Sequence, residues 1–232
     1  SPSVQAQPLR LALVADVHAG LFMRGWQIER LVDRLNALDV DAVVVAGDWT
    51  YEPPRDLHVL LAPFARLRHP VWGVLGNHDT GAPGPPLAAA LRQALQGHGV
   101  QLLEGQRLLF RGWEVLGLGD LWGGDPRGDV ARLLPPGTPT VPRLVLAHQP
   151  DTAALLPAGS ARLVLSGHTH GGQIMLPWIT RHWVLPGMSA QGWFEGLNTT
   201  PAGPLFVTAG VGTIGLPARL AVVPRIDVLR IE

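Results

Sequence analysis

The sequence predicts a single α/β domain with many strands. Short apolar runs alternate with helix-period patterns through the first half of the chain, and this alternation is typical of strands joined by helices. The 232 residues are 47% hydrophobic, which is enough to build one well-buried core. No repeat, linker or change of composition divides the chain. We therefore expect one domain over residues 1–232, in which residues 1–8 form a flexible lead.

The first half of the chain supplies three strands and the helices between them. Continuous apolar runs predict strands at 11–15, 42–46 and 71–75. A helix between the first two strands is predicted by apolar residues at helical spacing, namely Ile28, Leu31, Val32, Leu35 and Leu38. Proline suits the first turn of a helix and not its interior, so Pro63 and Pro86 each predict the beginning of a further helix.

The second half predicts a hairpin, one short helix and further strands. Segments 107–110 and 113–118 indicate a β-hairpin, and a cap at Asp125 predicts a short helix after it. Segment 171–204 is rich in Gly, Pro and Trp without periodicity, so we expect a long ordered loop there. The remaining apolar runs predict strands at 144–147, 163–165, 205–209 and 226–231.

The residues that suggest chemistry come immediately after the predicted strands. They are Asp16 and His18 after the first strand, Asp48 after the second, Asn77, His78 and Asp79 after the third, and His148, His168 and His170 after later ones. In open α/β sheets, ligands bind beyond the carboxyl ends of the strands, so these side chains are expected to meet at one edge. Residues two apart on an extended segment point to the same side, so Asp16 with His18, and His168 with His170, can face one site.

Composition narrows the chemistry of this edge. One aspartate or histidine after a strand is usually a cap or turn residue, and it is the joint occurrence of five such groups that favours a metal site. Cysteine and lysine are both absent, which excludes thiolate ligands, thiol nucleophiles and Schiff-base chemistry. Any metal must therefore be held by oxygen and imidazole. The 18 basic and 18 acidic residues balance, so we expect no nucleic-acid groove.

The order of these motifs resembles a known enzyme superfamily. D-x-H, G-D, G-N-H-D, an isolated His and G-H-T-H, from Asp16 to His170, resemble the calcineurin-like metallophosphoesterases. Segments 148–151, 166–173 and 210–219 further resemble a bacterial subgroup that contains phosphodiesterases and a UDP-2,3-diacylglucosamine pyrophosphatase of lipid A synthesis. The resemblance covers nearly the whole chain. It implies a four-layer α/β/β/α sandwich of two mixed sheets flanked by helices.

Carried over motif by motif, the resemblance implies a site for two divalent transition-metal ions. The implied ligands are Asp16, His18 and His170 for one ion, Asn77, His148 and His168 for the other, and Asp48 as the bridge. Imidazole with carboxylate suits Mn, Fe, Zn, Co or Ni better than Mg or Ca, and manganese is the first candidate. Two ions about 3.5–4 Å apart would clamp the oxygens of an in-line attack by a metal-bridging hydroxide.

His78 is the implied catalytic imidazole. We expect Asp79 to accept a hydrogen bond from the His78 ring and so to fix its orientation. His78 would then stabilise charge on the phosphoryl oxygens or protonate the leaving alkoxide. Trp49 directly follows the second motif, and we expect it to alter the wall of the site and hence the substrate preference.

Hydrolysis of a phosphodiester or pyrophosphate bond is therefore the predicted function. A phosphomonoesterase or protein phosphatase shares the motifs, and a UDP-2,3-diacylglucosamine pyrophosphatase is a further alternative. A non-catalytic metal-binding scaffold is disfavoured by the presence of His18, His78 and Asp79. The expected partner is a small phosphodiester or a nucleotide-lipid, and a lipid substrate would bring the protein near a membrane. The sequence leaves open the natural substrate, the metal, the oligomeric state and whether an anchor precedes Ser1.

Overall fold

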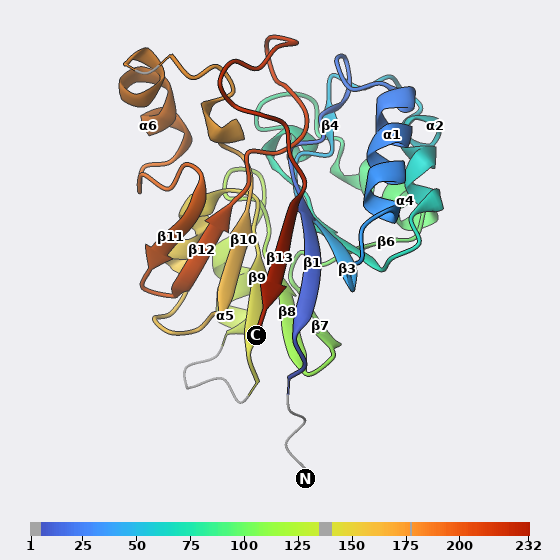
Figure 1. Cartoon of the computed structure of the whole chain (residues 1–232). Helices are drawn as coiled ribbons and strands as arrows, with labels where there is room; N and C mark the ends of the chain where they lie inside the picture. Colours follow the sequence, from blue (N-terminus) through green and yellow to red (C-terminus); the bar gives the residue numbers. More distant parts are fainter. Residues whose placement is uncertain (1–5, 135–140, 177) are drawn as a thin grey trace.

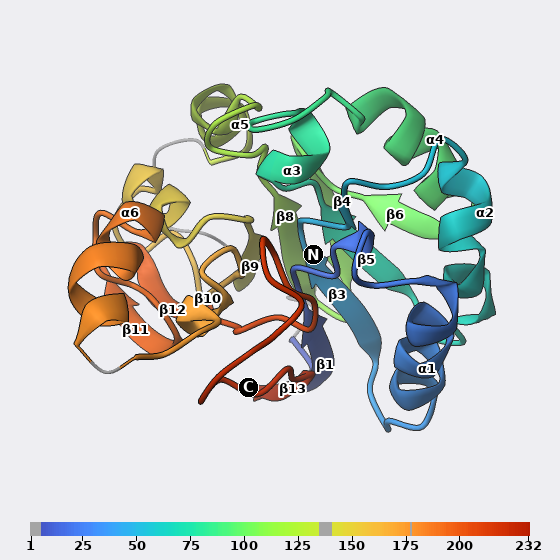
Figure 2. The same ribbon diagram turned by 90° about the horizontal axis from the view of Figure 1, so that it is seen from above.

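Two β-sheets face each other, and helices cover their outer faces (Figures 1 and 2). The structure is a computed structural model that describes residues 6–134, 141–176 and 178–232. The layer order of helix, sheet, sheet and helix confirms the predicted four-layer sandwich. Within the described residues, no helix has both the length and the apolar character needed to cross a bilayer.

The first sheet contains five strands in the order β13-β1-β3-β5-β6. Its four parallel strands are β1 (Leu9–Val14), β3 (Ala42–Ala46), β5 (Val71–Val74) and β6 (Val100–Leu102). Strand β13 (Asp227–Ile231) adds antiparallel to the edge at β1. The parallel strands are almost wholly buried, as is usual for strands covered on both faces, and this explains why they are continuous apolar runs in the sequence.

The second sheet has six strands in the order β11-β12-β10-β9-β8-β7. The strands are β7 (Gln106–Phe110), β8 (Trp113–Gly117), β9 (Arg143–Leu146), β10 (Leu163–Ser166), β11 (Gly196–Thr200) and β12 (Gly203–Val207). Strands β7 and β8 form the predicted hairpin, β11 pairs antiparallel with β12, and the others are parallel. A two-stranded ladder joins β2 (Ala19–Gly20) to β4 (Thr50–Tyr51) beyond the first sheet.

Three apolar cores hold the layers together. Helices α1 (Gly25–Asn36), α2 (Leu57–Leu61) and α4 (Ala88–Gly97) pack on the outer face of the first sheet. A second core lies between the sheets, and a third lies under α5 (Pro126–Leu133) and η2 (Pro150–Leu155) on the second sheet. The shorter helical turns are η1 (Ala62–Arg66), α3 (Asn77–Thr80), η3 (His170–Gly172), η4 (Thr180–Val184) and α6 (Leu185–Met188).

Some expectations about these elements were wrong. Segment 171–204 is not one loop, because it contains η3, η4, α6 and strand β11. The helix expected to begin at Pro86 begins at Ala88, with Leu87 as its cap residue. Gln7 belongs to the predicted flexible lead, yet its N–H donates to the carbonyl of Arg111 at 3.0 Å and its carbonyl accepts from the Trp113 indole at 2.7 Å. Residues 1–5 of that lead lie outside the described residues.

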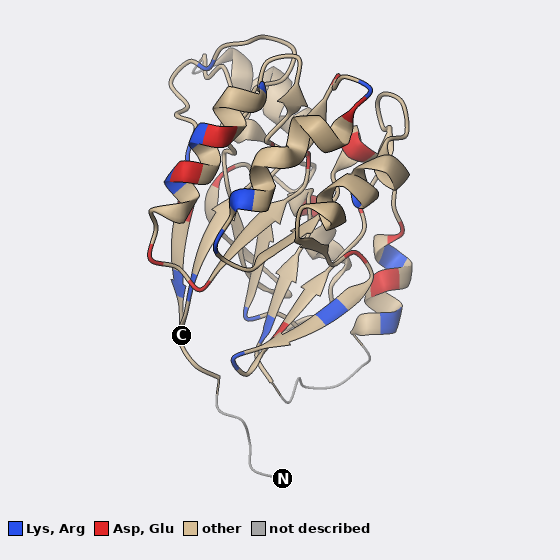
Figure 3. Ribbon diagram, turned by 90° about the vertical axis from the view of Figure 1, so that its right-hand side faces the viewer, with Lys and Arg blue, Asp and Glu red and all other residues tan. Residues whose placement is uncertain are grey.

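Charged positions are dispersed over the fold. Acidic and basic positions are interspersed along the helices and strands of the side that Figure 3 shows. On α1, for example, Asp33 pairs with Arg66 of η1 at 2.5 Å. This mixture agrees with the zero formal charge of the chain.

Candidate metal centre

The predicted site residues all lie beyond the carboxyl ends of five parallel strands. Strands β1, β3 and β5 of the first sheet and β9 and β10 of the second supply them. The loops after these strands bend sharply, and five of the residues have a positive φ: Asp16 (52°), His18 (51°), Asp48 (53°), His168 (73°) and His170 (52°). A left-handed conformation is uncommon outside glycine and is retained where the surroundings enforce it, typically at functional sites.

One group of side chains comes from the D-x-H and G-H-T-H loops. Ligand atoms of Asp16, His18 and His170 lie within 4.8 Å of one another, and all three residues are buried. The Nε2 atoms of His18 and His170 are 3.0 Å apart, and Nε2 of His170 is 3.7 Å from Oδ1 of Asp16. Two imidazole nitrogens and a carboxylate oxygen that converge in this way match the donor set of a transition-metal ion.

A second group lies beside the first. Ligand atoms of Asp48, His148 and His168 lie within 4.8 Å of one another, again with all three residues buried. Nε2 of His148 is 3.3 Å from Oδ2 of Asp48, 3.3 Å from Nδ1 of His168 and 3.1 Å from Oδ1 of Asn77. The structure therefore brings Asn77 into this group, as the sequence predicted.

Asp48 lies between the two groups. Its Oδ2 is 3.6 Å from Nε2 of His18 in the first group and 3.3 Å from Nε2 of His148 in the second. Its Oδ1 accepts from the backbone N–H of His78 at 3.0 Å. Gly76 makes this approach possible, because a Cβ there would collide with Oδ1 of Asp48. Asp48 is therefore in contact with both groups of side chains.

Backbone groups orient the ligands. Nδ1 of His148 donates to the carbonyl of Ala46 at 2.7 Å, which directs Nε2 toward Asp48. The backbone N–H of His168 donates to both carboxylate oxygens of Asp16 at 3.1 Å. Gly47 packs against the ring of His148, where a Cβ would lie 2.6 Å from Nδ1.

Burial keeps most of the imidazoles neutral. It lowers the pKa of His18 to about 4 and that of His168 to about 3, and it brings the pKa of His170 well below its usual range. A neutral imidazole keeps the lone pair that a metal needs. Burial opposes ionisation of Asp48, but His148, His18 and His78 outweigh it and lower the Asp48 pKa. Burial also opposes the charged form of His148, but Asp48 and Asp16 outweigh it and raise the His148 pKa to about 10, while burial raises the pKa of Asp16 to about 7. The oxygen and imidazole donors present fit two divalent ions, and binding of an ion would displace the protons that His148 and Asp16 hold.

Comparison with known proteins decides the family. A family model described as calcineurin-like phosphoesterase matches residues 9–172, which include every predicted ligand. The chain belongs to the calcineurin-like phosphoesterases. It is accordingly a metal-dependent phosphoester hydrolase, and the two ligand groups described above are consistent with that chemistry.

Two bacterial relatives cover most of this calcineurin-like phosphoesterase. Phosphodiesterase YaeI of Escherichia coli is 27% identical over 217 residues, which are 90% of this chain and 77% of that protein. The uncharacterized metallophosphoesterase YkuE of Bacillus subtilis is 27% identical over 236 residues, which are 96% of this chain and 79% of that protein. Other relatives are longer: the chain spans 60% of an uncharacterized metallophosphoesterase of Helicobacter pylori and 51% of the Danio rerio transmembrane protein with metallophosphoesterase domain.

A solved structure supports the fold. The protein TT1561 of Thermus thermophilus has a TM-score of 0.57 and 13% identity, over 89% of this chain and 92% of that one. At this identity the likeness shows the fold alone. It agrees with the two-sheet sandwich of the calcineurin-like phosphoesterases.

His78 lies at the rim of the centre. It is half-buried, with its ring centroid 5.3 Å from that of His18 and 5.4 Å from that of Tyr51. Burial lowers its pKa, with Asp48 acting in the opposite direction. A hollow of about 350 Å³ opens beside it, lined by apolar residues such as Pro53 and Leu87. His78 therefore lies between the ligand groups and this hollow.

Asp79 does not have the predicted partner. Its carboxylate accepts from the backbone N–H groups of Trp49, Thr50 and Gly76, each at 3.0 Å, and from the Thr50 hydroxyl at 2.9 Å. Among the described residues, the donors to the Asp79 carboxylate do not include the ring of His78. Adjacent residues on a helical turn point in different directions, and both belong to α3. Asp79 therefore joins the loop after β3 to the loop after β5.

This arrangement predicts that Asp79 matters first for stability. Asp79→Ala would leave three buried N–H groups without an acceptor, so we expect the free energy of unfolding to fall by about 2–5 kcal/mol. Chemical denaturation of the wild type and the variant measures this difference in the free energy of unfolding. Asp33→Ala, at an exposed ion pair with Arg66, is the control and should change stability by less than about 1 kcal/mol. Equal stability of the two variants would contradict the role given to Asp79.

Trp49 is not part of the wall of the site. It is fully buried in the core beneath the helices, with its ring centroid 5.3 Å from that of Phe64 and its indole N–H on the carbonyl of Val74 at 2.9 Å. The prediction that it forms part of the wall of the site was wrong, because its indole packs in the core between the first sheet and the helices. Tyr51, two residues further on, lies beside His18 and His78 instead.

Two residues near the centre carried little signal in the sequence. Arg219 donates to the carbonyls of Ala209 at 2.8 Å and of His170 at 3.2 Å, and so supports a ligand loop from 49 residues away. In the sequence, Arg219 was indicated only by its place in segment 210–219, which resembles the bacterial subgroup. The ring of Trp122 lies 4.8 Å from that of His168, although the side chain is half exposed. Only the tertiary structure shows that either residue is close to the ligands.

Proposed function

We propose that this calcineurin-like phosphoesterase hydrolyses a phosphodiester or pyrophosphate bond at a binuclear metal centre. The observation that carries the proposal is the position of Asp48, whose Oδ2 lies within 3.6 Å of one ligand group and 3.3 Å of the other. A carboxylate shared in this way supports two adjacent cations, because it reduces their mutual repulsion. When bound, such ions would acidify water and neutralise phosphate charge. Manganese is our first candidate for both, with Fe, Zn, Co and Ni as alternatives.

The protein's own groups orient the reactants. In this proposal Asp16, His18 and His170 hold one ion, and Asn77, His148 and His168 hold the other. His78 faces the open side, where its ring can donate a hydrogen bond to a phosphoryl oxygen or a proton to the leaving alkoxide. The four ligand histidines are buried and His78 is half-buried, so His78 is the imidazole of the group that a substrate can reach.

The surroundings of His78 support a substrate with more than a bare phosphate. The apolar hollow beside it would accept the second ester arm of a diester. The segment that carries η4 and α6 lies at the end of the molecule where the parallel strands end (Figure 1) and contacts η3, which carries His170. Three apolar side chains of η4 and of the residues just before it are exposed: Trp178, Ile179 and Trp183. An apolar rim of this kind supports a nucleotide-lipid substrate, and with it a position close to a membrane surface.

A comparison of model substrates tests the proposal. We expect metal-loaded protein to hydrolyse bis-(p-nitrophenyl) phosphate at least about tenfold faster than p-nitrophenyl phosphate, a difference of about 1.4 kcal/mol in the barrier. UDP-linked diacylglucosamine is the third arm, and chelation should abolish all turnover. The reverse preference would favour a phosphomonoesterase or protein phosphatase. No turnover with any metal would favour a non-catalytic scaffold.

A further inference from the structure

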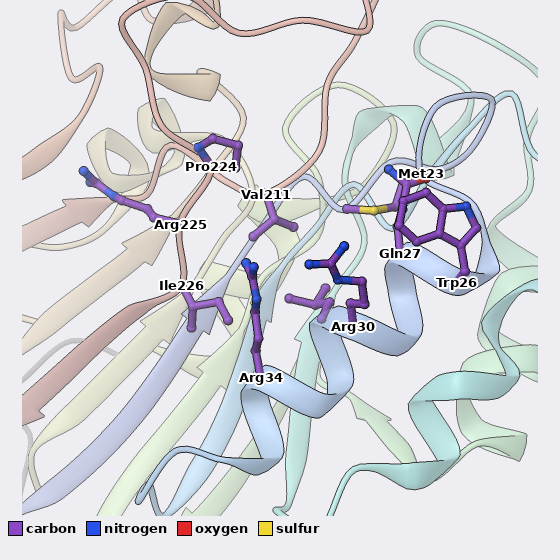
Figure 4. A pocket seen from close by; sticks show the side chains of 10 residues that line it. Met23, Trp26, Gln27, Arg30, Arg34, Val211, Pro224, Arg225 and Ile226 are labelled. Atoms are coloured by element: carbon purple, nitrogen blue, oxygen red, sulfur yellow. The ribbon is translucent and has the colours of Figure 1, made fainter.

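A hollow of about 340 Å³ lies between α1 and the segment before β13 (Figure 4). Helix α1 contributes Trp26, Arg30 and Arg34, and the C-terminal segment contributes Val211 and Ile226. None of the predicted metal ligands lines it. Figure 4 shows Arg30 and Arg34 reaching from successive turns of α1 toward Val211.

The hollow is strongly basic. Arg30, Arg34 and Arg225 line it, and no carboxylate is among its lining residues. Arg225 is already engaged, since it pairs with Glu195 at 2.7 Å and with Asp227 at 2.9 Å. In the part of the chain that the structure describes, neither Arg30 nor Arg34 forms an ion pair, and the nearby Asp33 pairs with Arg66.

Arg30 and Arg34 are exposed, so water screens their mutual repulsion, and a bound anion would remove the rest of it. Residues four apart on a helix are neighbours, and like charges at this spacing repel. Both guanidinium groups nevertheless project from α1 into one concave space instead of away from each other (Figure 4). Arginine binds phosphate with two parallel hydrogen bonds, which suits a pair of guanidinium groups around one phosphate.

Apart from Gln27, the other residues that line the hollow are apolar. Met23, Leu31, Val211 and Ile226 line the hollow, and Trp26 stands at its rim with 58% of its surface exposed. The lining is continuous with a second hollow, because Met23, Gln27, Val211 and Pro224 border both. A ligand that fills the hollow would therefore place an apolar part beside an anionic group that Arg30 and Arg34 bind.

We propose that this hollow is a second binding site, separate from the metal centre, for a ligand that joins a phosphate group to an apolar chain. Arg30 and Arg34 bind the phosphate, and Trp26 with Met23 and Ile226 packs against the apolar part. A free amphiphile and a phospholipid headgroup in a bilayer share this chemistry. The site does not depend on the proposed hydrolytic function, since it uses none of the same residues.

Octylphosphonate is the probe, because its carbon–phosphorus bond resists hydrolysis by the metal centre. We expect calorimetry with the metal-loaded protein to show binding that weakens at least about tenfold in Arg30→Gln/Arg34→Gln. The control Arg68→Gln/Arg127→Gln makes the same change of charge at exposed positions away from the hollow and should bind like wild type. Thermal unfolding and turnover of the diester verify that each variant is folded with its metal centre intact.

Two further arms test the apolar part and the source of the phosphate. Trp26→Ala should weaken octylphosphonate more than methylphosphonate, which lacks a chain. Sedimentation with phosphatidic acid vesicles that depends on Arg30 and Arg34 would identify a bilayer headgroup, and octylphosphonate binding without vesicle binding would identify a free ligand. Equal affinity of the two double variants for octylphosphonate would overturn the proposal.

Discussion

Replacing Asp48 by Asn is expected to lower hydrolysis of the diester by more than about 10³-fold, beyond the usual loss from removing one electrostatic contact at an active site. The substitution keeps the shape of the side chain and the oxygen that accepts from the backbone N–H of His78. It removes the negative charge that lies within 3.6 Å of His18 and 3.3 Å of His148. Without that charge, two cations would repel each other across the centre, so bound metal should fall from two ions per chain to one or none.

Elemental analysis of the purified variant, after saturation with manganese and removal of excess, measures the metal directly. Asp41→Asn is the matched control, because Asp41 is an aspartate in an ion pair with Arg111 far from the ligands. It should retain both ions and full turnover. Two firmly held ions in Asp48→Asn would remove the basis for a bridging carboxylate.

His78→Ala is expected to separate metal binding from catalysis. The ring lies beside the centre without entering either ligand group, so both ions should remain bound. Turnover of the diester should fall by about 10²–10⁴-fold, the usual contribution of a positioned acid or hydrogen-bond donor. Steady-state kinetics and elemental analysis on the same preparation give both quantities.

The leaving group offers a sharper test of His78. A diester with a poor leaving alkoxide needs the proton more than one with p-nitrophenolate, so the variant should lose more activity on the poorer leaving group. His98→Ala is the control, since that ring stacks on His58 away from the metal centre. Parallel loss of metal and activity in His78→Ala would show that the residue acts as a ligand or a structural support.

The sequence was sufficient to predict where the strands lie and which polar residues come together at their ends. Strands β1, β3 and β5 lie within two residues of their predicted ends, because strands buried on both faces must be continuous apolar runs. Topology then brings their carboxyl ends together, so Asp16, Asp48 and Asn77 meet although they are far apart in the chain.

The orientation of individual side chains was beyond reach of the sequence. The spacing argument for Asp16 and His18 assumed an extended segment, whereas both residues are left-handed and face the site through a sharp bend. Asp79 turns into the core because the N–H groups after β3 need an acceptor there, and the indole of Trp49 packs against Phe64 in the core under the helices. The turn at η4 lacks the length over which a helical period can be recognised.

The origin of the ligands has a consequence for the whole molecule. Asp16, Asp48 and Asn77 follow strands of one sheet, whereas His148, His168 and His170 follow strands of the other. An ion held by either group would thus draw on both halves of the sandwich and would cross-link them. Metal affinity and the packing of the two halves would then be thermodynamically coupled: chelation should lower the melting temperature, and cavities cut into the core between the halves should weaken metal retention.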